Sequence, residues 1–289
     1  MRIHIEWASE HERQIFSLFT AIAAVFLVCM ALVSVRKKGV FRAIFRLFGV
    51  GLSRFKKLLY EFRRKAFHLL GLLIPIIYYF GLHFRLPRFI AQIFGRQELY
   101  LFTPGRASLI IFILFALDAI FEAVRISDIY GMRAVLNRWL GALLRPSEQA
   151  GRPAGSLFFM LGVFLTLALN PPLTAILACV FLTVGDFAAA AIGTVFGRTK
   201  IVGKKSLEGS LACLVACFMA GLGAAAFVGS SFGQPLLGPW AAMVLAGAAV
   251  TAVVELFSGG LFDDNLTIPP LAALGMTVVA RVLQLDLSL

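Results

Sequence analysis

Eight long apolar runs, separated by short polar segments, constrain the fold of this 289-residue chain more than any other feature. A helix that crosses the hydrocarbon core of a bilayer needs about 20 apolar residues, within a range of about 17–25. The pattern therefore predicts an all-α, polytopic membrane bundle of about eight transmembrane helices, within a range of about seven to nine. They are expected at residues 15–35, 66–82, 108–124, 156–170, 172–191, 209–228, 237–257 and 268–284.

The composition of the chain also indicates a membrane protein. Charged residues make up 15% of the chain, whereas they make up about 25% of a typical soluble domain. The net charge of +12 does not indicate nucleic-acid binding, because no basic soluble domain with interleaved aromatic residues is present. All four cysteines lie inside apolar runs, so neither a disulfide framework nor a zinc site is predicted.

The distribution of basic residues predicts the orientation of the chain. Lys and Arg collect in cytoplasmic loops, and residues 36–65 carry eleven of them. This places the segment after the first span in the cytoplasm and the N-terminus outside. The segments after the third, fifth and seventh spans then also face the cytoplasm. Segment 83–106 carries four arginines although this orientation places it on the outer side of the membrane. We take the eleven basic residues of segment 36–65 to outweigh these four. We expect a multi-pass protein of the inner (cell) membrane.

Residues 41–62 have a pattern of their own, in which apolar residues recur at helical spacing with Arg and Lys between them. This pattern predicts a basic amphipathic helix that lies in the membrane interface against anionic lipid. Packing of the same helix against its neighbours is the alternative.

Segment 185–209 interrupts the apolar pattern with an acid, several glycines and four basic residues. An acid near the end of an apolar helix is costly, and basic side chains beside glycine-permitted amides are the usual means of holding phosphate. Helix packing of the glycines and a simple positive loop are the alternatives. The candidate residues are Asp186, Gly193, Gly197, Arg198, Lys204, Lys205, Ser206, Glu208 and Gly209.

The end of this segment has the sequence of a helix start. Ser206 is a predicted N-cap, and Glu208 falls in the first turn, where an acid is favourable. The amides at such a helix N-terminus also favour phosphate. The segment has no G-x-x-x-x-G-K-[ST] motif, which excludes a P-loop.

Two further polar groups each occupy one predicted helix face. In the first group, Glu61, Arg64, Lys65 and His68 follow one another at helical spacing. A surface ion-pair cluster and a satisfied core histidine are the alternatives for this group.

The second group begins with Asp118, Glu122 and Arg125 inside the third span, at i, i+4 and i+7. Two acids beside one arginine are poor choices for an inert membrane helix. Glu148 and Gly155 follow, just before the fourth span, and we include them among the candidates.

A last group lies around the seventh and eighth spans. Glu255 falls inside the seventh span, and Asp263, Asp264 and Asn265 precede the eighth. Their oxygens suit Mg²⁺, which takes one or two carboxylates and keeps several waters. Asp, Asn and Pro are also common at turns and helix starts, which is the alternative.

Together these motifs resemble the CTP-dependent lipid-alcohol (polyprenol) kinases: dolichol kinase, phytol kinase and CTP-dependent diacylglycerol kinase. The resemblance covers about residues 60–270, in the expected order. The matching segments are Glu61-x-x-Arg64-Lys65-x-x-His68-x-x-Gly71, the Asp118–Arg125 helix, Glu148 with Gly155-Ser156, Gly185-Asp186, Gly193-x-x-x-Gly197-Arg198, Gly203-Lys204-Lys205-Ser206-x-Glu208-Gly209 and Asp264-Asn265-Leu-Thr-Ile-Pro269.

The resemblance implies transfer of the γ-phosphoryl group of CTP to a lipid hydroxyl at the cytoplasmic face, with Mg²⁺ as cofactor. It implies metal binding by Asp186, Asp264 and Asn265, and catalytic roles for Asp186, Glu208 and His68. It implies a nucleotide site made of Arg64, Lys65, Gly193, Gly197, Arg198, Lys204, Lys205, Ser206 and Gly209. Further site candidates are Glu61, Asp118, Arg125, Glu148, Gly155 and Glu255. Residues 61–289 would form the catalytic domain, and residues 1–60 would carry the first transmembrane helix and the amphipathic segment.

The sequence leaves two other functions open. Phosphatidate cytidylyltransferases have a partly similar block of glycine, acid and lysine, and they release pyrophosphate rather than CDP. A transporter of an anionic substrate also uses paired acids and bases inside its spans. The clustering of the polar residues at one predicted face favours the kinase over the transporter.

Overall fold

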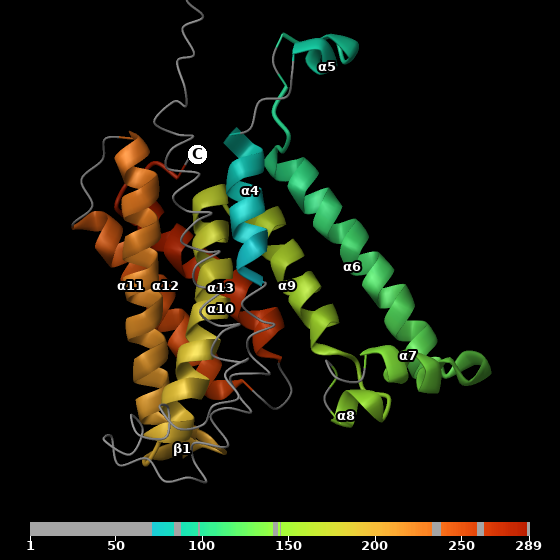
Figure 1. The fold of residues 1–289 in the computed structure, drawn as a ribbon. Helices are drawn as coiled ribbons and strands as arrows, with labels where there is room; N and C mark the ends of the chain where they lie inside the picture. The colour runs from blue at the N-terminus through green and yellow to red at the C-terminus, as the bar shows by residue number, and fades with distance from the viewer. Residues whose placement is uncertain are drawn as a thin grey trace, which may run out of the picture.

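The computed structural model of the chain describes residues 71–83, 88–97, 99–140, 144, 146–232, 238–258 and 263–287. They form a bundle of long helices with one short β-hairpin (Figure 1). The helices of the bundle are α4 (Leu73–His83), α6 (Pro104–Ser127), α9 (Gly155–Leu169), α10 (Pro172–Val195), α11 (Leu207–Phe232), α12 (Pro239–Phe257) and α13 (Asp264–Val282). The short elements are α5 (Arg88–Ile93), η2 (Ile129–Gly131), α7 (Met132–Leu140), α8 (Pro146–Gln149), β1 (Lys200–Val202) and β2 (Lys205–Ser206).

Five of the described helices are long and apolar enough to cross a membrane: α6, α10, α11, α12 and α13. Two shorter apolar helices, α4 and α9, coincide with two further predicted spans. The prediction of a mostly helical membrane bundle is confirmed, but a count of eight spans is not. The first predicted span (15–35), the amphipathic segment (41–62) and the Glu61, Arg64, Lys65 and His68 group lie outside the described residues.

The hairpin between α10 and α11 corrects the all-α prediction. Strands β1 and β2 pair antiparallel, with Lys200 opposite Ser206 and Val202 opposite Lys205. Gly203 occupies the turn with a φ of +54°, a left-handed conformation that glycine adopts without steric cost. The pattern of apolar residues around this segment does not predict a strand pairing as short as that of β1 with β2.

Helix α10 lies at the centre of the bundle and packs against α4, α9, α11, α12 and α13. Its side chains are buried on most sides, including Leu177 and Phe181, which are both 0% exposed. The helix begins at Pro172, directly after Asn170 and Pro171, because proline suits the first turn of a helix and disfavours its interior. The break that the sequence predicts between the fourth and fifth spans is therefore present.

Glycines allow the helices around α10 to approach closely. A Cβ atom on Gly185 would lie 2.7 Å from Cys217 Sγ and 2.9 Å from Cys213 Sγ on α11. A Cβ atom on Gly247 of α12 would lie 2.5 Å from Met276 Cγ on α13. Helices in membranes associate through such small residues, and the two cysteines of α11 serve as packing residues, as the sequence predicts.

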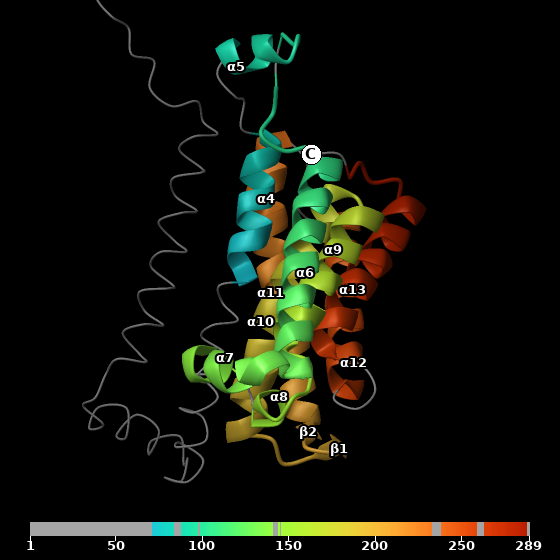
Figure 2. The ribbon, with the colours of Figure 1, turned by 90° about the vertical axis from the view of Figure 1, so that its right-hand side faces the viewer.

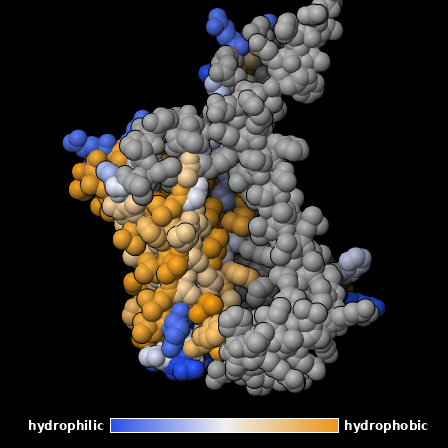
Figure 3. All heavy atoms as spheres, turned by 60° about the vertical axis from the view of Figure 1, so that its left-hand side comes forward, coloured by the Kyte–Doolittle hydropathy of each residue, from blue (hydrophilic) through white to orange (hydrophobic). Residues whose placement is uncertain are grey.

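Apolar side chains also cover the outside of the bundle. In Figure 3, apolar residues cover most of the bundle surface that is not drawn in grey, with hydrophilic residues gathered towards its two ends. Leu211, Val215 and Met219 of α11 are all more than half exposed. Exposed apolar surface of this extent on a helical bundle is suited to the hydrocarbon core of a bilayer.

The packing of α9 on the first turn of α13 gives a test of the fold. A Cβ atom on Gly162 would overlap the backbone oxygen of Asn265 and lie 3.0 Å from Leu266 Cα. Because backbone atoms cannot move aside as a side chain can, we expect Gly162→Ala to lower the free energy of unfolding in detergent by about 1–3 kcal/mol. Gly223 of α11 has nothing within 4 Å of its Cβ position, so Gly223→Ala is the matched control and should not destabilise the protein. Equal unfolding curves for the two variants would contradict this packing.

Candidate functional site

The polar residues of the predicted site lie at one end of the bundle. The C-termini of α6, α10 and α12 meet the N-termini of α9, α11 and α13 there, together with α7, α8 and the hairpin (Figures 1 and 2). We call this the site end. The N-terminus of a helix carries partial positive charge and unpaired amide groups, and its C-terminus carries partial negative charge. With three ends of each kind at the site end, an anion is favoured only directly beside an N-terminus.

A buried ion pair anchors α6 at the site end. Arg125 is 0% exposed and meets Glu122 in a bidentate arrangement, with Nε 2.8 Å from Oε1 and Nη2 2.7 Å from Oε2. The same arginine donates through Nη1 to the backbone oxygen of Glu148 and through Nη2 to that of Arg152, at 2.6 Å. The guanidinium is therefore engaged with the protein itself, and its role is to fasten α6 to the α8–α9 segment.

The partner carboxylate completes this connection. Glu122 Oε2 accepts a hydrogen bond of 2.8 Å from the backbone amide of Ala154, the N-cap of α9. The carboxylate therefore satisfies an amide at a helix N-terminus, where negative charge is stabilised. Glu122, which the predicted site did not include, is as deeply engaged as Arg125. Its spacing of three residues from Arg125 is the sequence signal for the pair.

Asp118 lies one helical turn before this ion pair on α6. Ser156 of α9 hydrogen-bonds to its carboxylate. Among the residues that the structure describes, Asp118 Oδ2 is buried without a hydrogen-bond partner. A buried oxygen of this kind is expensive unless something pairs with it, so it marks a position where a donor from a bound molecule would fit.

Glu148, Gly155 and Asn265 lie together although they are far apart in the sequence. The amide of Gly155 donates to Glu148 Oε1 at 3.1 Å. A Cβ atom on Gly155 would lie 3.6 Å from Asn265 Nδ2 and 3.7 Å from Glu148 Oε1. The glycine therefore leaves room for the buried Asn265 of α13 at the start of α9. The group at Glu148 and Gly155 and the group at the start of α13, which the sequence treats separately, lie side by side.

Gly193 of α10 and Gly197, which follows the C-cap of α10, pack against the start of α11. A Cβ atom on Gly197 would lie 2.5 Å from Ser206 Oγ, and one on Gly193 would lie 3.4 Å from the same atom. Ser206 is buried and accepts a hydrogen bond from the amide of Gly209 at 3.3 Å. Ser206 thus caps α11, as predicted, and the two glycines allow the end of α10 and the start of α11 to pack closely.

Glu208 holds the loop that follows α10. Its carboxylate accepts from the amide of Thr199, with distances of 3.0 Å to Oε1 and 3.3 Å to Oε2. The backbone oxygen of Thr199 in turn accepts from the amide of Leu207 at 2.9 Å. Glu208 is therefore engaged in shaping the basic loop, and this geometry favours a positioning role over the catalytic role implied by the resemblance.

Lys205 ties the hairpin to the end of α12. Its Nζ atom lies 2.8 Å from Glu255 Oε1 and 2.8 Å from Ser258 Oγ, and it also donates to the backbone oxygen of Glu255. These three acceptors match the three donors of an ammonium group. The pairing uses the ammonium inside the protein, so Lys205 is not available to an external anion in this structure.

We expect Lys205→Met to lower the free energy of unfolding by about 1.5–3 kcal/mol, because hydrogen bonds to charged groups contribute about that much and Glu255 would lose its partner. Glu255 and Ser258 are both buried. Lys204→Met is the matched control, since Lys204 is exposed and exposed substitutions usually change stability by about 0.5 kcal/mol or less. Unfolding in a denaturant titration measures both. The ion pair would be unimportant to the fold if both variants unfolded like the wild type.

Three basic residues of the hairpin region face outward: Arg198, Lys200 and Lys204 are exposed. No ion pair joins any of them to an acid in the part of the chain that the structure describes. They are the hairpin cations available to an external anion, at the end of the bundle where the helix N-termini also favour one.

Asp186 lies deeper than the hairpin, on the buried side of α10, and is 7% exposed. Asp186 and Glu255 both act electrostatically on the thiol of Cys213 in α11, so the two acids lie in the same part of the bundle interior. The sequence did not predict this proximity, because 69 residues separate the two acids, from position 186 to position 255.

The Asp263–Asn265 segment forms the start of α13. Asp263 is the N-cap, and its Oδ1 accepts from the amide of Asn265 at 3.0 Å. Asp264 is half-buried in the first turn. Within the described residues, no group of three or more His, Cys, Asp or Glu side chains is arranged to hold a metal. One or two carboxylates are enough for Mg²⁺ that arrives with a nucleotide and keeps its waters, so Asp264 and Asn265 fit such an ion but not a preformed metal cage.

Comparisons with known proteins bear on these residues. The chain is 26% identical to an uncharacterized protein of Rickettsia prowazekii over 228 residues, which cover 78% of this chain and 97% of that protein. It is 31% identical to the CTP-dependent diacylglycerol kinase 1 of Schizosaccharomyces pombe over 142 residues, which cover 47% of this chain and 65% of that kinase. No family model matches the chain, and no solved structure matches it at a significant level. The chain is thus similar, over about half its length, to a CTP-dependent lipid kinase.

Proposed function

We propose that the protein is an integral membrane lipid kinase that transfers the γ-phosphoryl group of CTP to the hydroxyl group of a lipid alcohol. The partial similarity to a CTP-dependent diacylglycerol kinase carries the proposal. The lipid oxygen would form a bond to the γ-phosphorus, and the bond from that phosphorus to the β–γ bridging oxygen would break. CDP would leave, and the hydroxyl proton would pass to a carboxylate of the site. Polyprenols, diacylglycerol and phytol-like alcohols are the proposed acceptors.

The nucleotide half of the proposed site is the hairpin region. Phosphoryl transfer depends on positioning and charge neutralisation. Arg198 and Lys204 are exposed and offer charge to the triphosphate, and Glu208 and Ser206 hold the loop and the helix start in place. Arg64, Lys65 and His68, outside the described residues, would complete this half.

The metal half of the proposed site is made of residues from α10 and from the start of α13. Asp264, with Asn265, and Asp186 are the proposed Mg²⁺ ligands, and bound Mg²⁺ would neutralise charge on the transferred phosphate. Asp264 is half-buried at the start of α13. The next residue, Asn265, lies beside Gly155 of α9, and the neighbouring Ser156 hydrogen-bonds to Asp118. The proposal places the site end in the cytoplasm, where CTP is available, and the N-terminus outside the inner membrane.

The experiment that tests this function uses the purified full chain in detergent with Mg²⁺. Each γ-labelled nucleoside triphosphate is offered with a polyprenol, a diacylglycerol or phytol, and lipid products are separated by thin-layer chromatography. We expect labelled lipid phosphate with CTP. An absence of transfer from every nucleotide to every lipid would overturn the kinase and favour the transporter.

A further inference from the structure

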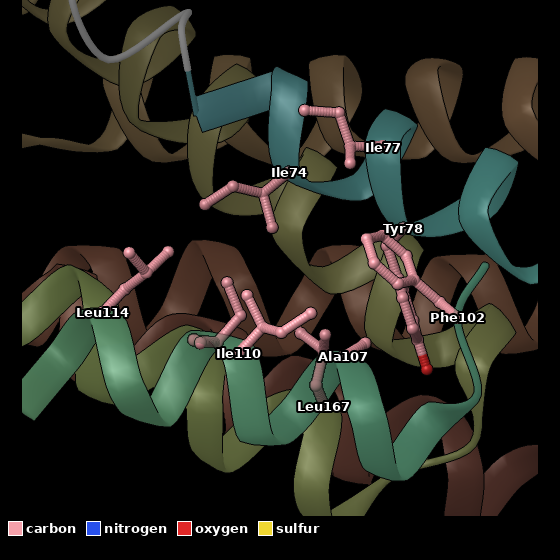
Figure 4. Close-up of a pocket in the computed structure, with 9 residues that line it drawn as sticks. Ile74, Ile77, Tyr78, Phe102, Ala107, Ile110, Leu114 and Leu167 are labelled. Carbon is pink, nitrogen blue, oxygen red and sulfur yellow. The ribbon is translucent and has the colours of Figure 1, made fainter.

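An apolar pocket lies in the membrane-spanning part of the bundle, between α4, α6 and α9. Its volume is about 180 Å³. Every lining side chain except that of Tyr78 is a hydrocarbon, and Tyr78 itself is 3% exposed. Figure 4 shows Ile74 and Ile77 of α4 on one side of the pocket and Ile110 and Leu114 of α6 on the other. A pocket with such a lining recognises hydrocarbon and offers little to a polar molecule.

The pocket belongs to one continuous stripe of α6. Ala107, Ile111, Leu114, Asp118 and Glu122 follow one another at intervals of three or four residues, so they share a helix face. The first three line the pocket, and the next two are acids. The face is therefore apolar along its first half and ionisable towards the site end. This order matches a molecule with a hydrocarbon chain and a polar head.

The unpaired oxygen of Asp118 marks where the polar head would lie. Leu114, at the lower edge of the pocket, precedes Asp118 by four residues, or about 6 Å along the helix. Asp118 Oδ2 is buried and has no hydrogen-bond partner among the described residues. A hydroxyl group at the end of a chain in the pocket would supply the missing donor.

The surface around the pocket indicates the route by which a bound molecule would reach it. Leu109, Ile113 and Leu117, on the outward face of the same helix, are each about half exposed or more. This face is apolar and suited to the bilayer interior, so a lipid reaches the pocket without leaving the membrane. A water-soluble alcohol has no comparable route.

We propose that the pocket between α4, α6 and α9 holds the first part of the lipid substrate's hydrocarbon chain and that Asp118 Oδ2 accepts a hydrogen bond from the lipid's hydroxyl group. The inference rests on the proposed kinase function and assigns the part of the site that would bind the lipid, the acceptor of the phosphoryl group. Seven residues separate Ala107 from Leu114, so the pocket extends about 10 Å along α6. It therefore has room for one hydrocarbon chain near the hydroxyl group and leaves the rest of the lipid, including any second chain, in the bilayer.

Filling the pocket tests the chain site. With diacylglycerol and CTP, we expect Ala107→Trp to lower kcat/KM for the lipid about tenfold or more, because a filled pocket excludes methylene groups, and to leave the KM for CTP unchanged. Leu109→Trp, on the outward face of α6, is the matched control and should retain wild-type kinetics. Equal lipid kcat/KM values for the two variants would overturn the chain site. Asp118→Asn should raise the KM for the lipid and not that for CTP, and unchanged lipid kinetics would overturn the role of Asp118.

A second measurement does not depend on activity. A diacylglycerol with a photoreactive diazirine in the acyl chain is cross-linked to the full-length protein, and labelled peptides are identified by mass spectrometry. We expect labelling of α4 and α6 residues at the pocket that Ala107→Trp abolishes and Leu109→Trp preserves. Labelling that Ala107→Trp leaves unchanged would overturn the pocket. If labelling depends on the pocket but the protein transfers no phosphate, the result would support the lipid site and contradict the proposed kinase function.

Discussion

Replacing Glu122 with leucine is expected to lower the free energy of unfolding by about 3–5 kcal/mol, because it leaves the Arg125 guanidinium buried without its counter-charge. Arg125 is 0% exposed and Glu122 is 3% exposed, so water cannot take over the lost interaction. The change also removes the acceptor of the Ala154 amide at the start of α9. Unfolding in a denaturant titration of the detergent-solubilised protein measures the effect.

A double-mutant cycle separates the ion pair from simple loss of packing. Glu122→Leu, Arg125→Leu and the double variant are compared in the same titration. Residues in direct contact show coupling energies of about 0.5–3 kcal/mol, and the bidentate geometry favours the upper part of this range. Strictly additive losses would show that the two side chains contribute independently and would contradict the clamp between α6 and the α8–α9 segment.

Asp186→Asn is expected to reduce phosphoryl transfer by a factor on the order of 10²–10⁴, the range for loss of a positioned acid–base group. The carboxylate is buried on α10 near Glu255 and Cys213, and a charge inside a membrane helix is costly unless it is paired or has a function. Asparagine keeps the size of the side chain and removes its charge. Initial rates with γ-labelled CTP, measured beside the melting temperature, separate lost chemistry from lost folding.

The control for Asp186 is an acid at the same end of the bundle. Asp128 is exposed at the C-cap of α6, and its side chain accepts only from the backbone amide of Arg133 in the described hydrogen bonds. Asparagine can accept the same bond, so Asp128→Asn should leave transfer unchanged. Near-normal transfer by Asp186→Asn, with the fold intact, would remove Asp186 from the proposed site.

Hydropathy was sufficient to predict most of the long helices that the structure describes. A membrane span must be a long apolar helix because every backbone polar group has to be satisfied inside it. The predicted spans at 108–124 and 172–191 therefore fall within α6 and α10. The hairpin escaped prediction because its two strands hold five residues in all and depend on one glycine turn rather than on a periodic pattern.

The residue types of the candidate site were predictable, but their partners were not. Lys205 and Glu255 lie 50 positions apart, and Arg125 reaches the backbone of Glu148 across 23 positions. No local pattern encodes such pairs, since they depend on how α6, α9 and α12 pack. For this reason the sequence treats Lys205 and Arg125 as available cations, whereas the structure engages both and leaves Arg198, Lys200 and Lys204 exposed.

The roles of Ser156, Thr199 and Ser258 as partners were missed for a related reason, although Ser156 belongs to one of the matching segments. Each is a small polar residue whose type is common at helix ends and loops, so its presence in the sequence is uninformative. Their importance becomes visible only beside Asp118, Glu208 and Lys205. A carboxylate or an ammonium group inside an apolar run is a strong sequence signal of a polar site. The hydroxyl or amide group that forms its hydrogen bond is a weak signal.

The position of the label that reaches the lipid tests the central claim most directly. The purified protein is given Mg²⁺, diacylglycerol, polyprenol or phosphatidate, and CTP labelled either at the γ-phosphorus or at the α-phosphorus. A kinase of the proposed kind transfers the γ-label to the lipid hydroxyl and leaves the α-label in CDP. Transfer of the α-label to a phosphatidate acceptor, with release of pyrophosphate, would contradict the kinase and identify a cytidylyltransferase.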